Sequence, residues 1–293
     1  MKAIIFGING QDGFYLNKLL ISEKIEIIGV SRNNPAWQLG DVADFAFVKG
    51  LIQQHQPAYI FHLAANSTTR HDVLFENHET ISTGTLNILE AVYQYSKHTK
   101  VFLSGSGLQF VNTGLPIKET DEFDANSPYA IARIQSVYAA RYYRTLGLHV
   151  YVGYFFNHDS PLRSERHVNQ KIVQTLKRIS KGSKETLNLF DISVQKEFGF
   201  AGDIVKGIWA LINNDTVFEA NIGTGKAYSI NEWLNVCGEL TNTDWRKTTT
   251  TQQDFKKEYE VLVSNSSVIK GLGWQHETSL EKLAEIMFDY KYE

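Results

Sequence analysis

The sequence has a single cysteine, Cys237, so no disulfide can form within the chain and a disulfide-stabilised secreted domain is excluded. Cys237 lies in a helical pattern, where we expect it to fill the core. The apolar run at the N-terminus ends at Gly7, which is too short for a signal peptide or a membrane span. We therefore expect a cytoplasmic protein with no membrane partner.

Neither sign of charge dominates, because 29 Lys and Arg face 32 Asp and Glu, a formal net charge of -3. A nucleic-acid-binding surface needs a positive excess, so no nucleic-acid partner is expected. The nine histidines are scattered and form no metal-binding spacing, so we expect no metal site. A chain of 293 residues that is 43% hydrophobic can bury a large core, and its partner is expected to be a small molecule.

A glycine-rich turn, Gly7–Gly13, directly follows the apolar run Ala3–Phe6. A strand, a tight turn and a helix start in this order predict a site for a dinucleotide pyrophosphate. Gly7 allows the turn, Gly10 lets the backbone approach the phosphates, and Gly13 lets the helix pack closely on the sheet. Unpaired amides at the helix start would bind the phosphates. The side chains expected at this site are Asn9, Gln11 and Asp12.

Strand-like and helical patterns alternate up to about Tyr154. The strands expected are Lys2–Phe6, Glu26–Val30, Tyr59–Leu63, Lys100–Leu103 and His149–Phe156. The helices expected between them are Gly13–Ser22, Phe45–His55, Glu79–Ser96 and Pro128–Leu146. This alternation predicts an α/β fold with a doubly wound parallel (Rossmann) sheet that binds ligands at the carboxyl ends of its strands. We expect residues 1–156 to form the dinucleotide-binding domain and 157–293 a smaller mixed α/β substrate lobe, with some chain exchange between them.

The segment after the second strand bears on the choice of cofactor. A site for NAD(H) usually has an acidic residue there for the ribose hydroxyls, but this segment begins Ser31-Arg32 and has no acid. Ser31 and Arg32 suit a ribose 2′-phosphate, so NADP(H) is predicted, with NAD(H) as the alternative. Arg32 is otherwise an ordinary surface arginine. Asp41 is expected to accept a hydrogen bond from the adenine amino group, or else to act as a turn or capping aspartate.

Several segments together resemble the NAD-dependent epimerase/dehydratase family, the extended short-chain dehydrogenases. They are Gly7–Gly13, Gly40–Asp44, Pro57–Ala65, Ser127–Ala130 and Leu272–Trp274. Two further segments, Phe156–Arg163 and Val168–Ile172, are similar to GDP-mannose 4,6-dehydratases and GDP-4-keto-6-deoxymannose reductases. The resemblance covers essentially the whole chain. It implies a nucleoside diphosphate sugar as substrate, reversible hydride transfer at C4 of the sugar, and a Ser/Thr-Tyr-Lys active site.

The catalytic residues implied by this resemblance include departures from the family pattern. Tyr129 matches the family's tyrosine, and Arg133 stands in place of its lysine. A phenol with a pKa of about 10 needs nearby positive charge to exchange its proton at neutral pH. Arg133 supplies that charge and a contact to the nicotinamide ribose, but it cannot relay a proton. In a gapless alignment Gly105 replaces the family's hydroxyl and Gly107 the dehydratases' glutamate, which leaves Ser104 or Ser106 to hold the carbonyl oxygen.

Binding residues also follow from the resemblance. Those implied for the cofactor are Val42, Leu63, Ala64, Ala65, Tyr129, Arg133 and Phe156. Those implied for the substrate are Asn66, Asn157, Arg163, Lys171 and Lys196. Lys196 stands where the family has an arginine that faces phosphate. Asp254–Glu258 matches the family's arginine-proline-acid segment poorly, so the sequence supports binding of a guanine base less than it supports binding of a diphosphate.

We interpret the protein as an NADP(H)-dependent reductase of a 4-keto sugar linked to a nucleoside diphosphate, most plausibly GDP. Reduction needs one hydride and one proton, whereas 4,6-dehydration needs an additional acid and base. The alternatives are a GDP-hexose dehydratase or epimerase with an altered site, and a non-catalytic dinucleotide-binding sensor or subunit. A homodimer or homotetramer is expected through Glu79–Ser96 and Pro128–Leu146, whose apolar and aromatic residues Ile88, Val92, Tyr138 and Tyr142 permit such a contact.

Overall fold

A seven-stranded parallel sheet forms the centre of the molecule. The computed structural model describes residues 1–252 and 257–290. The strand order is β11-β6-β5-β4-β1-β2-β3, and every neighbouring pair is parallel. The strands are β1 Lys2–Phe6, β2 Glu26–Ser31, β3 Gln38–Leu39, β4 Tyr59–His62, β5 Lys100–Ser106, β6 Val150–Phe155 and β11 Glu219–Ile222. All carboxyl ends therefore lie at one edge, and the predicted doubly wound α/β fold is confirmed.

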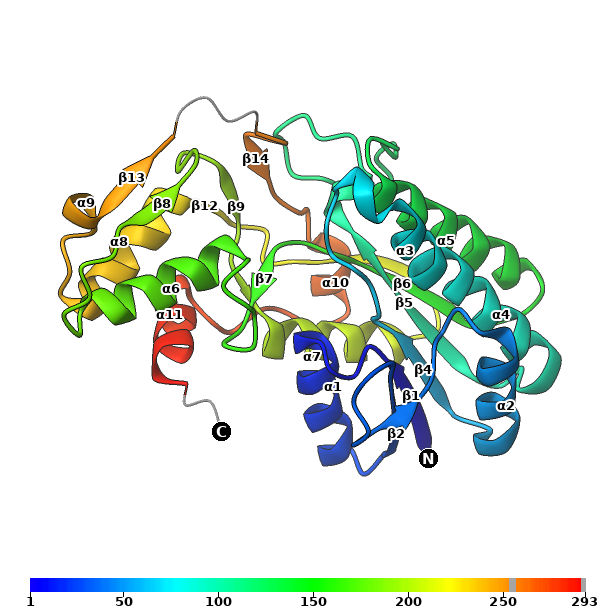
Figure 1. Ribbon diagram of the computed structural model, residues 1–293. Helices are drawn as coiled ribbons and strands as arrows, with labels where there is room; N and C mark the ends of the chain where they lie inside the picture. The colour runs from blue at the N-terminus through cyan, green and yellow to red at the C-terminus, as the bar shows by residue number, and fades with distance from the viewer. Residues whose placement is uncertain (253–256, 291–293) are drawn as a thin grey trace.

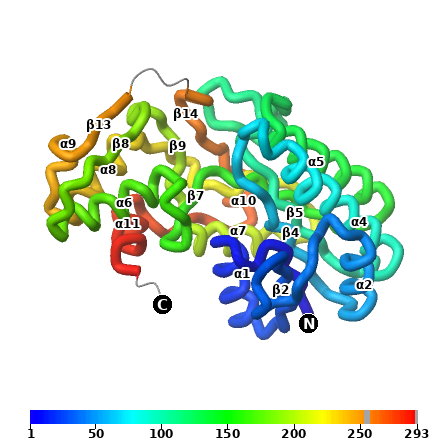
Figure 2. The backbone as a smooth tube through the Cα atoms, viewed as in Figure 1, coloured from blue at the N-terminus to red at the C-terminus, as the bar shows by residue number. Residues whose placement is uncertain are grey.

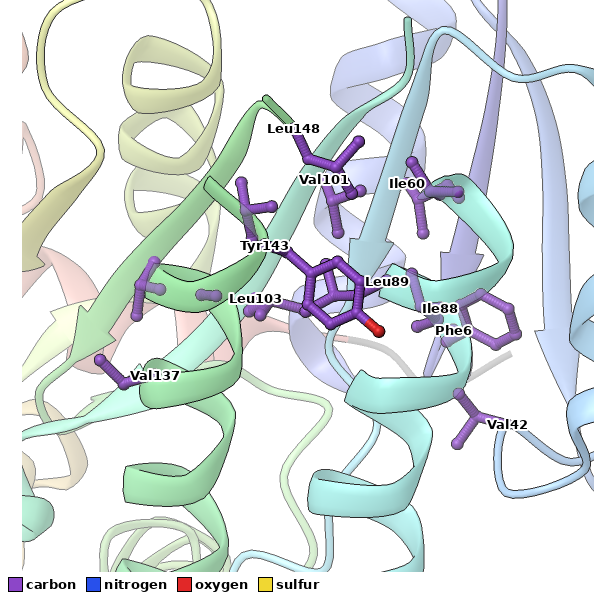
Figure 3. Close-up of a cluster of buried hydrophobic side chains, with 14 of the residues drawn as sticks. Phe6, Val42, Ile60, Ile88, Leu89, Val101, Leu103, Val137, Tyr143 and Leu148 are labelled. Carbon is purple, nitrogen blue, oxygen red and sulfur yellow. The ribbon is translucent and has the colours of Figure 1, made fainter. Parts of the chain in front are cut away.

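Helices cover both faces of this sheet (Figure 1). One face carries α2 Phe45–His55, α4 Gly84–Tyr95 and α5 Pro128–Thr145, and the other carries α1 Gln11–Ser22, α7 Ala201–Ile212 and α10 Ser267–Gly271. Alternate strand residues serve the two cores, so Ile4 and Phe6 of β1 face one and Ala3 and Ile5 face the other. Figure 3 shows Phe6 in the first core among side chains of α4 and neighbouring strands.

The predicted helix Glu79–Ser96 is interrupted. A 3₁₀ turn, His71–Val73, leads into α3 Leu74–Asn77, a π-helical turn at His78–Thr83, and then α4. In this turn the Thr80 carbonyl contacts His62 Nε2 at 3.1 Å, and the Ile81 carbonyl accepts from Ser136 Oγ at 3.2 Å. Residues 79–95 are nevertheless all helical, as predicted, and what apolar periodicity does not indicate is the π-helical turn at the start.

A second lobe lies beside the sheet (Figure 2). Its helices are α6 Val168–Ile179, α8 Ile230–Thr241, α9 Trp245–Thr248 and α11 Leu280–Asp289. Its strands are β7 His158–Asp159, β8 Leu187–Leu189, β9 Gln195–Glu197, β10 Gly199–Phe200, β12 Ala227–Ser229, β13 Thr249–Thr251 and β14 Val261–Leu262. Leu176, Trp233 and Leu283 meet in its separate hydrophobic core. None of the helices in the described ranges is long and apolar enough to cross a membrane.

The chain returns to the large sheet after forming part of the second lobe. α7 and β11 follow residue 157, yet β11 pairs with β6, and α7 packs on the same face as α1. Glu219 at the start of β11 accepts from Arg141 Nη2 and Tyr154 Oη, both at 2.7 Å. Burial opposes ionisation of Glu219, but these bonds outweigh it and lower its pKa to about 2. The division of the chain into two domains at residue 156 stays a prediction, and α7 and β11 cross it by returning to the large sheet.

Candidate active site

Two adjoining clefts open at the carboxyl edge of the sheet. The first, of about 230 Å³, is lined by Phe6, Gly7, Asn9, Gly10, Val30–Asn33, Gly40, Val42, Leu63–Ala65 and Thr80. The second, of about 420 Å³, is lined by Gly10–Asp12, Leu63, Ala65, Ser67–Thr69, Ser104, Ser106, Leu108, Tyr129, Arg133, Phe155–His158, Arg163, His167, Glu258, Tyr259 and Leu262. Gly10, Leu63 and Ala65 line both, so the clefts form one continuous path.

The glycine turn between β1 and α1 leaves no room for side chains. Gly7 has φ +92°, and a Cβ there would lie 2.6 Å from Ala64 N. A Cβ on Gly13 would lie 2.4 Å from the Gly7 oxygen, and one on Gly10 would lie 3.3 Å from it. The backbone at the start of α1 is therefore bare toward the first cleft, where the helix N-terminus favours negative charge. These residues fit the pyrophosphate of a dinucleotide.

Polar side chains meet at the end of β2, beside the glycine turn. Asn9 Nδ2 donates to Ser31 Oγ at 2.6 Å, and Ser31 Oγ also accepts from the Asn34 amide at 3.0 Å. Arg32 lines the same cleft with its side chain 57% exposed. Its guanidinium lies 3.5 Å from Glu76, so the cation is available at the cleft but has a neighbouring carboxylate.

Asp41 and Asn66, both predicted to bind ligands, are not among the residues that line the clefts. Asp41 Oδ1 accepts from the Ala43 amide at 2.9 Å, as a turn aspartate does, and this was the alternative to adenine binding. Asn66, expected to bind substrate, donates through Nδ2 to Glu76 at 3.1 Å. The roles of these two side chains in ligand binding therefore stay predictions.

Tyr129 and Arg133 line the second cleft from the first turns of α5. Ser127 caps the helix by accepting from the Ala130 amide at 3.2 Å, which places Tyr129 and Arg133 one turn apart on one face. The Arg133 guanidinium lies 5.1 Å from the centre of the Tyr129 ring. Arg133 Nη1 donates to Ser104 Oγ at 2.8 Å and also to the Ser104 carbonyl. Among the described residues none accepts a hydrogen bond from the buried Arg133 Nε.

The alignment of Gly105 with the family's hydroxyl and of Gly107 with the dehydratases' glutamate stays a prediction, and the structure shows where the residues at the end of β5 lie. Successive strand residues face opposite sides, and Ser104 and Ser106 both line the cleft, whereas a Cβ on Gly105 would lie 2.6 Å from the Tyr154 ring. Ser106 also caps the following 3₁₀ turn, Gly107–Gln109. A Cβ on Gly107 would lie 2.7 Å from the ring of Phe156, which lines the cleft, and Leu108 lines it as well.

A basic group lies at the other end of the second cleft, where substrate contacts were predicted. Arg163 Nη1 lies 3.3 Å from His167 Nε2, and Arg163 Nε is buried with no hydrogen-bond acceptor in the described ranges. Burial, assisted by the Arg163 charge, lowers the pKa of His167 to about 4, so His167 is neutral at neutral pH and accepts from Arg163. Asn157 lines the cleft beside them. The arrangement suits an anionic group such as a diphosphate.

Lys196 and Lys171 occupy different surroundings. Lys196 is only 8% exposed; burial lowers its pKa, the Asp159 charge opposes this, and the Arg163 charge adds to it. It therefore belongs electrostatically with the basic end of the cleft, although it is not among the lining residues. Lys171 Nζ donates to the Asn188 carbonyl at 2.6 Å, beside β8. The structure does not bring Lys171 to the cleft.

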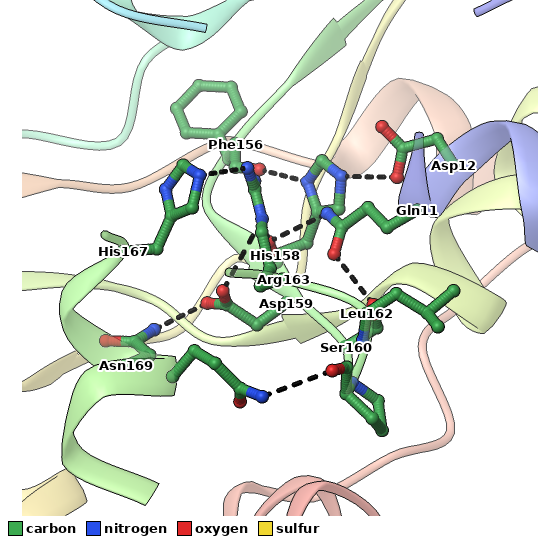
Figure 4. A network of polar contacts seen from close by, with 12 residues as sticks. Gln11, Asp12, Phe156, His158, Asp159, Ser160, Leu162, Arg163, His167 and Asn169 are labelled. Atoms are coloured by element: carbon green, nitrogen blue, oxygen red, sulfur yellow. Dashed lines mark hydrogen bonds and ion pairs between the residues drawn. The ribbon is translucent and has the colours of Figure 1, made fainter. Parts of the chain in front are cut away.

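Gln11 and Asp12 face the second cleft and contact the segment that follows β6 (Figure 4). Gln11 Nε2 donates to the His158 carbonyl at 3.3 Å, and Asp12 Oδ1 lies 2.9 Å from His158 Nε2. These residues were predicted only as cofactor contacts. The sequence left His158 as a sugar contact or a turn cap, and the structure shows a buried side chain, 6% exposed, at the wall of the cleft.

Other lining residues were missed from the sequence. Ser67–Thr69 follow β4, and the rule that ligands bind after strand ends was a signal for them. Glu258 and Tyr259 come from a distant part of the chain, and Thr69 Oγ1 donates to Glu258 at 2.5 Å. Burial, with a smaller effect of Glu258, raises the pKa of Tyr259 to about 12. Of the segment Asp254–Glu258, residues 254–256 lie outside the described residues.

Comparison with known proteins identifies the family. The family description GDP-mannose 4,6 dehydratase matches residues 4–287. The chain is 28% identical over 321 residues to GDP-mannose 4,6 dehydratase 1 of Arabidopsis thaliana, which covers 98% of this chain and 88% of the relative.

Solved structures share the fold. A UDP-glucose 4-epimerase from Thermotoga maritima with UDP-glucose superposes with a TM-score of 0.89 at 22% identity, covering 99% of this chain and 98% of that one. RMD from Pseudomonas aeruginosa complexed with NADPH has a TM-score of 0.85 at 18% identity, covering 98% and 96%. The resemblance seen in the sequence is thereby confirmed: the chain belongs to the GDP-mannose 4,6 dehydratase family, enzymes of the nucleotide-sugar epimerase and dehydratase type.

Proposed function

We propose that this protein reduces the C4 ketone of a hexose linked to a nucleoside diphosphate, with NADPH as reductant and GDP as the nucleoside diphosphate. The observation that carries the proposal is the composition of the second cleft, which is lined by Tyr129, Ser106 and Arg133, while Gly107 stands at the position that the resemblance assigns to the dehydratases' glutamate. Reduction needs a hydride and one proton, and this set provides the proton. The GDP part of the proposal is supported by the names of the relatives.

Each residue has a defined part in this reaction. The nicotinamide cofactor, when bound, supplies the hydride to C4. Tyr129 gives its phenolic proton to the C4 oxygen, and Ser106 donates a hydrogen bond that holds this oxygen. Arg133 stabilises the resulting phenolate by its charge, 5.1 Å from the ring centre. Arg163 and Asn157 bind the diphosphate, with Lys196 adding positive charge behind them.

A second candidate is 4,6-dehydration of a GDP-hexose. Two observations favour it: the relatives are dehydratases, and Glu258 brings a carboxylate to the same cleft from the second lobe. In this reaction Glu258 would remove the C5 proton or protonate the leaving C6 hydroxyl, in place of the dehydratases' glutamate that Gly107 replaces. A third candidate, a non-catalytic dinucleotide-binding subunit, follows from the same departures and requires cofactor binding without turnover.

Mass spectrometry separates these candidates. The purified protein is incubated with GDP-mannose, and separately with GDP-4-keto-6-deoxymannose plus NADPH. A gain of two hydrogens by the keto sugar supports reduction, and loss of water from GDP-mannose without added reductant supports dehydration. No change in either compound, with NADPH still bound, would contradict both catalytic candidates for GDP sugars.

The cofactor preference depends on Arg32. We expect Arg32→Ala to weaken NADPH binding by about 10-fold or more while NADH binding stays the same, because only NADPH has a 2′-phosphate for the guanidinium. Fluorescence titration of both dinucleotides measures this. Arg70→Ala is the control, since Arg70 is also exposed and paired with a carboxylate, Asp72. An equal loss for both dinucleotides would contradict the 2′-phosphate assignment.

Arg133 is expected to be an adapted part of the site. Arg133→Lys should lower kcat by about 10-fold, because a lysine lacks the second nitrogen that lets a guanidinium contact Ser104 and lie against the Tyr129 ring together. Steady-state kinetics on the substrate found above measures it. A faster Arg133→Lys enzyme would show instead that the arginine handicaps the reaction.

Assembly and location are further proposals. We propose a cytoplasmic homodimer that pairs α4 and α5 of two copies. Tyr138 and Tyr142 on α5 are 59% and 60% exposed and Leu86 on α4 is 49% exposed, an unusual set of large apolar side chains for a free surface. Ile88 and Val92, which were predicted for this contact, are instead fully buried within the subunit. Light scattering on the purified protein measures the mass of the assembly.

A further inference from the structure

We infer that Gln11 and Asp12, in the cofactor-binding turn, are positioning residues for the substrate: they hold the segment His158–Arg163 and thereby set the place of the Arg163 guanidinium. The inference rests on the proposed function for the identity of the ligand, a nucleoside diphosphate sugar. It adds a role to a part of the chain that the glycine pattern assigns to the dinucleotide alone.

Gln11 makes two bonds to this segment. Its Nε2 donates to the His158 carbonyl at 3.3 Å, and its Oε1 accepts from Ser160 Oγ at 2.9 Å. Gln11 is 9% exposed and Ser160 is fully buried, so water does not replace these partners easily. Both the nitrogen and the oxygen of the Gln11 amide are thus bonded to this segment, and His158 lies 147 residues away in the sequence.

Asp12 adds an ion pair to the same segment. His158 Nε2 lies 2.9 Å from Asp12 Oδ1, while His158 Nδ1 lies 2.7 Å from the Phe156 carbonyl. Both contacts need an N–H on the ring, so they are satisfied together only by the protonated imidazole. Burial disfavours the charge on His158, but Asp12 outweighs it and raises the pKa of His158; burial likewise opposes ionisation of Asp12, and His158 outweighs it and lowers the pKa of that carboxyl.

Arg163 is attached to the other side of the segment (Figure 4). Its Nη2 donates to the same His158 carbonyl at 3.3 Å, and its Nε lies 3.7 Å from Asp159. Asp159 is in turn held by Asn169 of α6 at 2.5 Å. The His158 carbonyl therefore accepts from Gln11 and Arg163 at once, and a shift of this carbonyl moves both. This is the physical link between the glycine turn and the basic end of the cleft.

The charges around Asp12 and His158 make their contact depend on pH, which a purely structural contact would not do. Asp12 is influenced by His158, Arg163 and Arg133, and His158 by Asp12 and Arg163. A neutral His158 has one N–H and must release either Asp12 or the Phe156 carbonyl. Both contacts of His158, to Asp12 and to the Phe156 carbonyl, are therefore present below the ordinary pKa of histidine. One of them is lost as the pH rises through the raised pKa of His158.

The test compares Gln11→Ala, Asp12→Ala and Asp12→Asn in the full chain. An asparagine can donate to a neutral imidazole, so Asp12→Asn keeps a contact but not the ion pair. Hydrogen–deuterium exchange of residues 156–163 is measured without ligand from about pH 6 to about pH 9, corrected for intrinsic rates. Affinities for GDP-mannose and NADPH are measured separately. Asp44→Ala is the control, because Asp44 caps α2 by accepting from the Ala46 and Phe47 amides.

We expect exchange at 156–163 to rise several-fold in both alanine variants, and GDP-mannose binding to weaken about 10-fold, which is more than NADPH binding weakens. Wild-type protection should fall with rising pH, and Asp12→Asn should lose this dependence. Unchanged exchange at 156–163 in both alanine variants would overturn the inference. Failure of the wild type to bind GDP-mannose would contradict the proposed function, while the exchange result would still decide the positioning role.

Discussion

Replacing Tyr129 by phenylalanine is expected to lower kcat/KM by about 10²–10⁴-fold, since this removes the one proton that the proposed reduction requires. Tyr129 is 8% exposed and lies against the Arg133 guanidinium, so the phenylalanine ring keeps the packing and loses only the hydroxyl. Steady-state kinetics with the turned-over sugar nucleotide measures the loss, and NADPH titration should show binding within about 3-fold of wild type.

The matched control is Tyr138→Phe, which removes a hydroxyl from the same helix at a side chain that is 59% exposed. It should leave turnover unchanged. If Tyr129→Phe keeps more than about a tenth of wild-type activity, another group supplies the proton, and Tyr259, which lines the same cleft, becomes the residue to replace next.

The largest expected effect on stability is at Glu197, where we expect Glu197→Ala to lower the free energy of unfolding by about 3 kcal/mol or more. Glu197 is fully buried in β9 and its carboxylate joins three parts of the chain. It accepts from the Ser264 amide at 2.7 Å and Ser264 Oγ at 2.6 Å, and from Thr224 Oγ1 at 3.1 Å. The Thr224 and Gly225 amides also donate to it. Alanine would leave these buried donors without an acceptor.

Urea unfolding followed by tryptophan fluorescence measures this effect. Glu197→Gln should cost less, about 1–3 kcal/mol, because the amide keeps one acceptor oxygen but turns a donor toward other donors. Glu285→Ala, which removes an exposed glutamate paired with Lys282, should stay within about 0.5 kcal/mol of wild type. A Glu197→Ala protein within about 1 kcal/mol of wild type would contradict the role of this carboxylate as the link between the segments.

Much of the fold was predictable because it depends on local patterns. The strand Lys2–Phe6 and the helix Phe45–His55 have the bounds that apolar periodicity indicated. The π-helical turn at His78–Thr83 escaped prediction, since it depends on side chains of β4 and α5 that bond to its carbonyls. Local preference determines that a helix forms, and packing against other elements decides its irregularities.

The candidate site divides in the same way. The spacing of Tyr129 and Arg133 places them on one helix face, and both line the second cleft. Which side chains of β5 face the cleft is decided by packing: Ser104 and Ser106 line it, whereas a Cβ on Gly105 would meet the Tyr154 ring. Lys171 has a charge that suits the substrate, but α6 directs it to the Asn188 carbonyl.

The sequence by itself determined the parallel α/β fold, the glycine turn between β1 and α1, and the pairing of Tyr129 with Arg133, because each depends on residues close together in the chain. Only the tertiary structure decided that Glu258 enters the cleft and that Asp12 meets His158, a pair separated by 146 residues. Backbone conformation and short side-chain spacings follow from local sterics and periodicity. Contacts between lobes depend on how two separately packed cores fit together, which no short pattern of residues records.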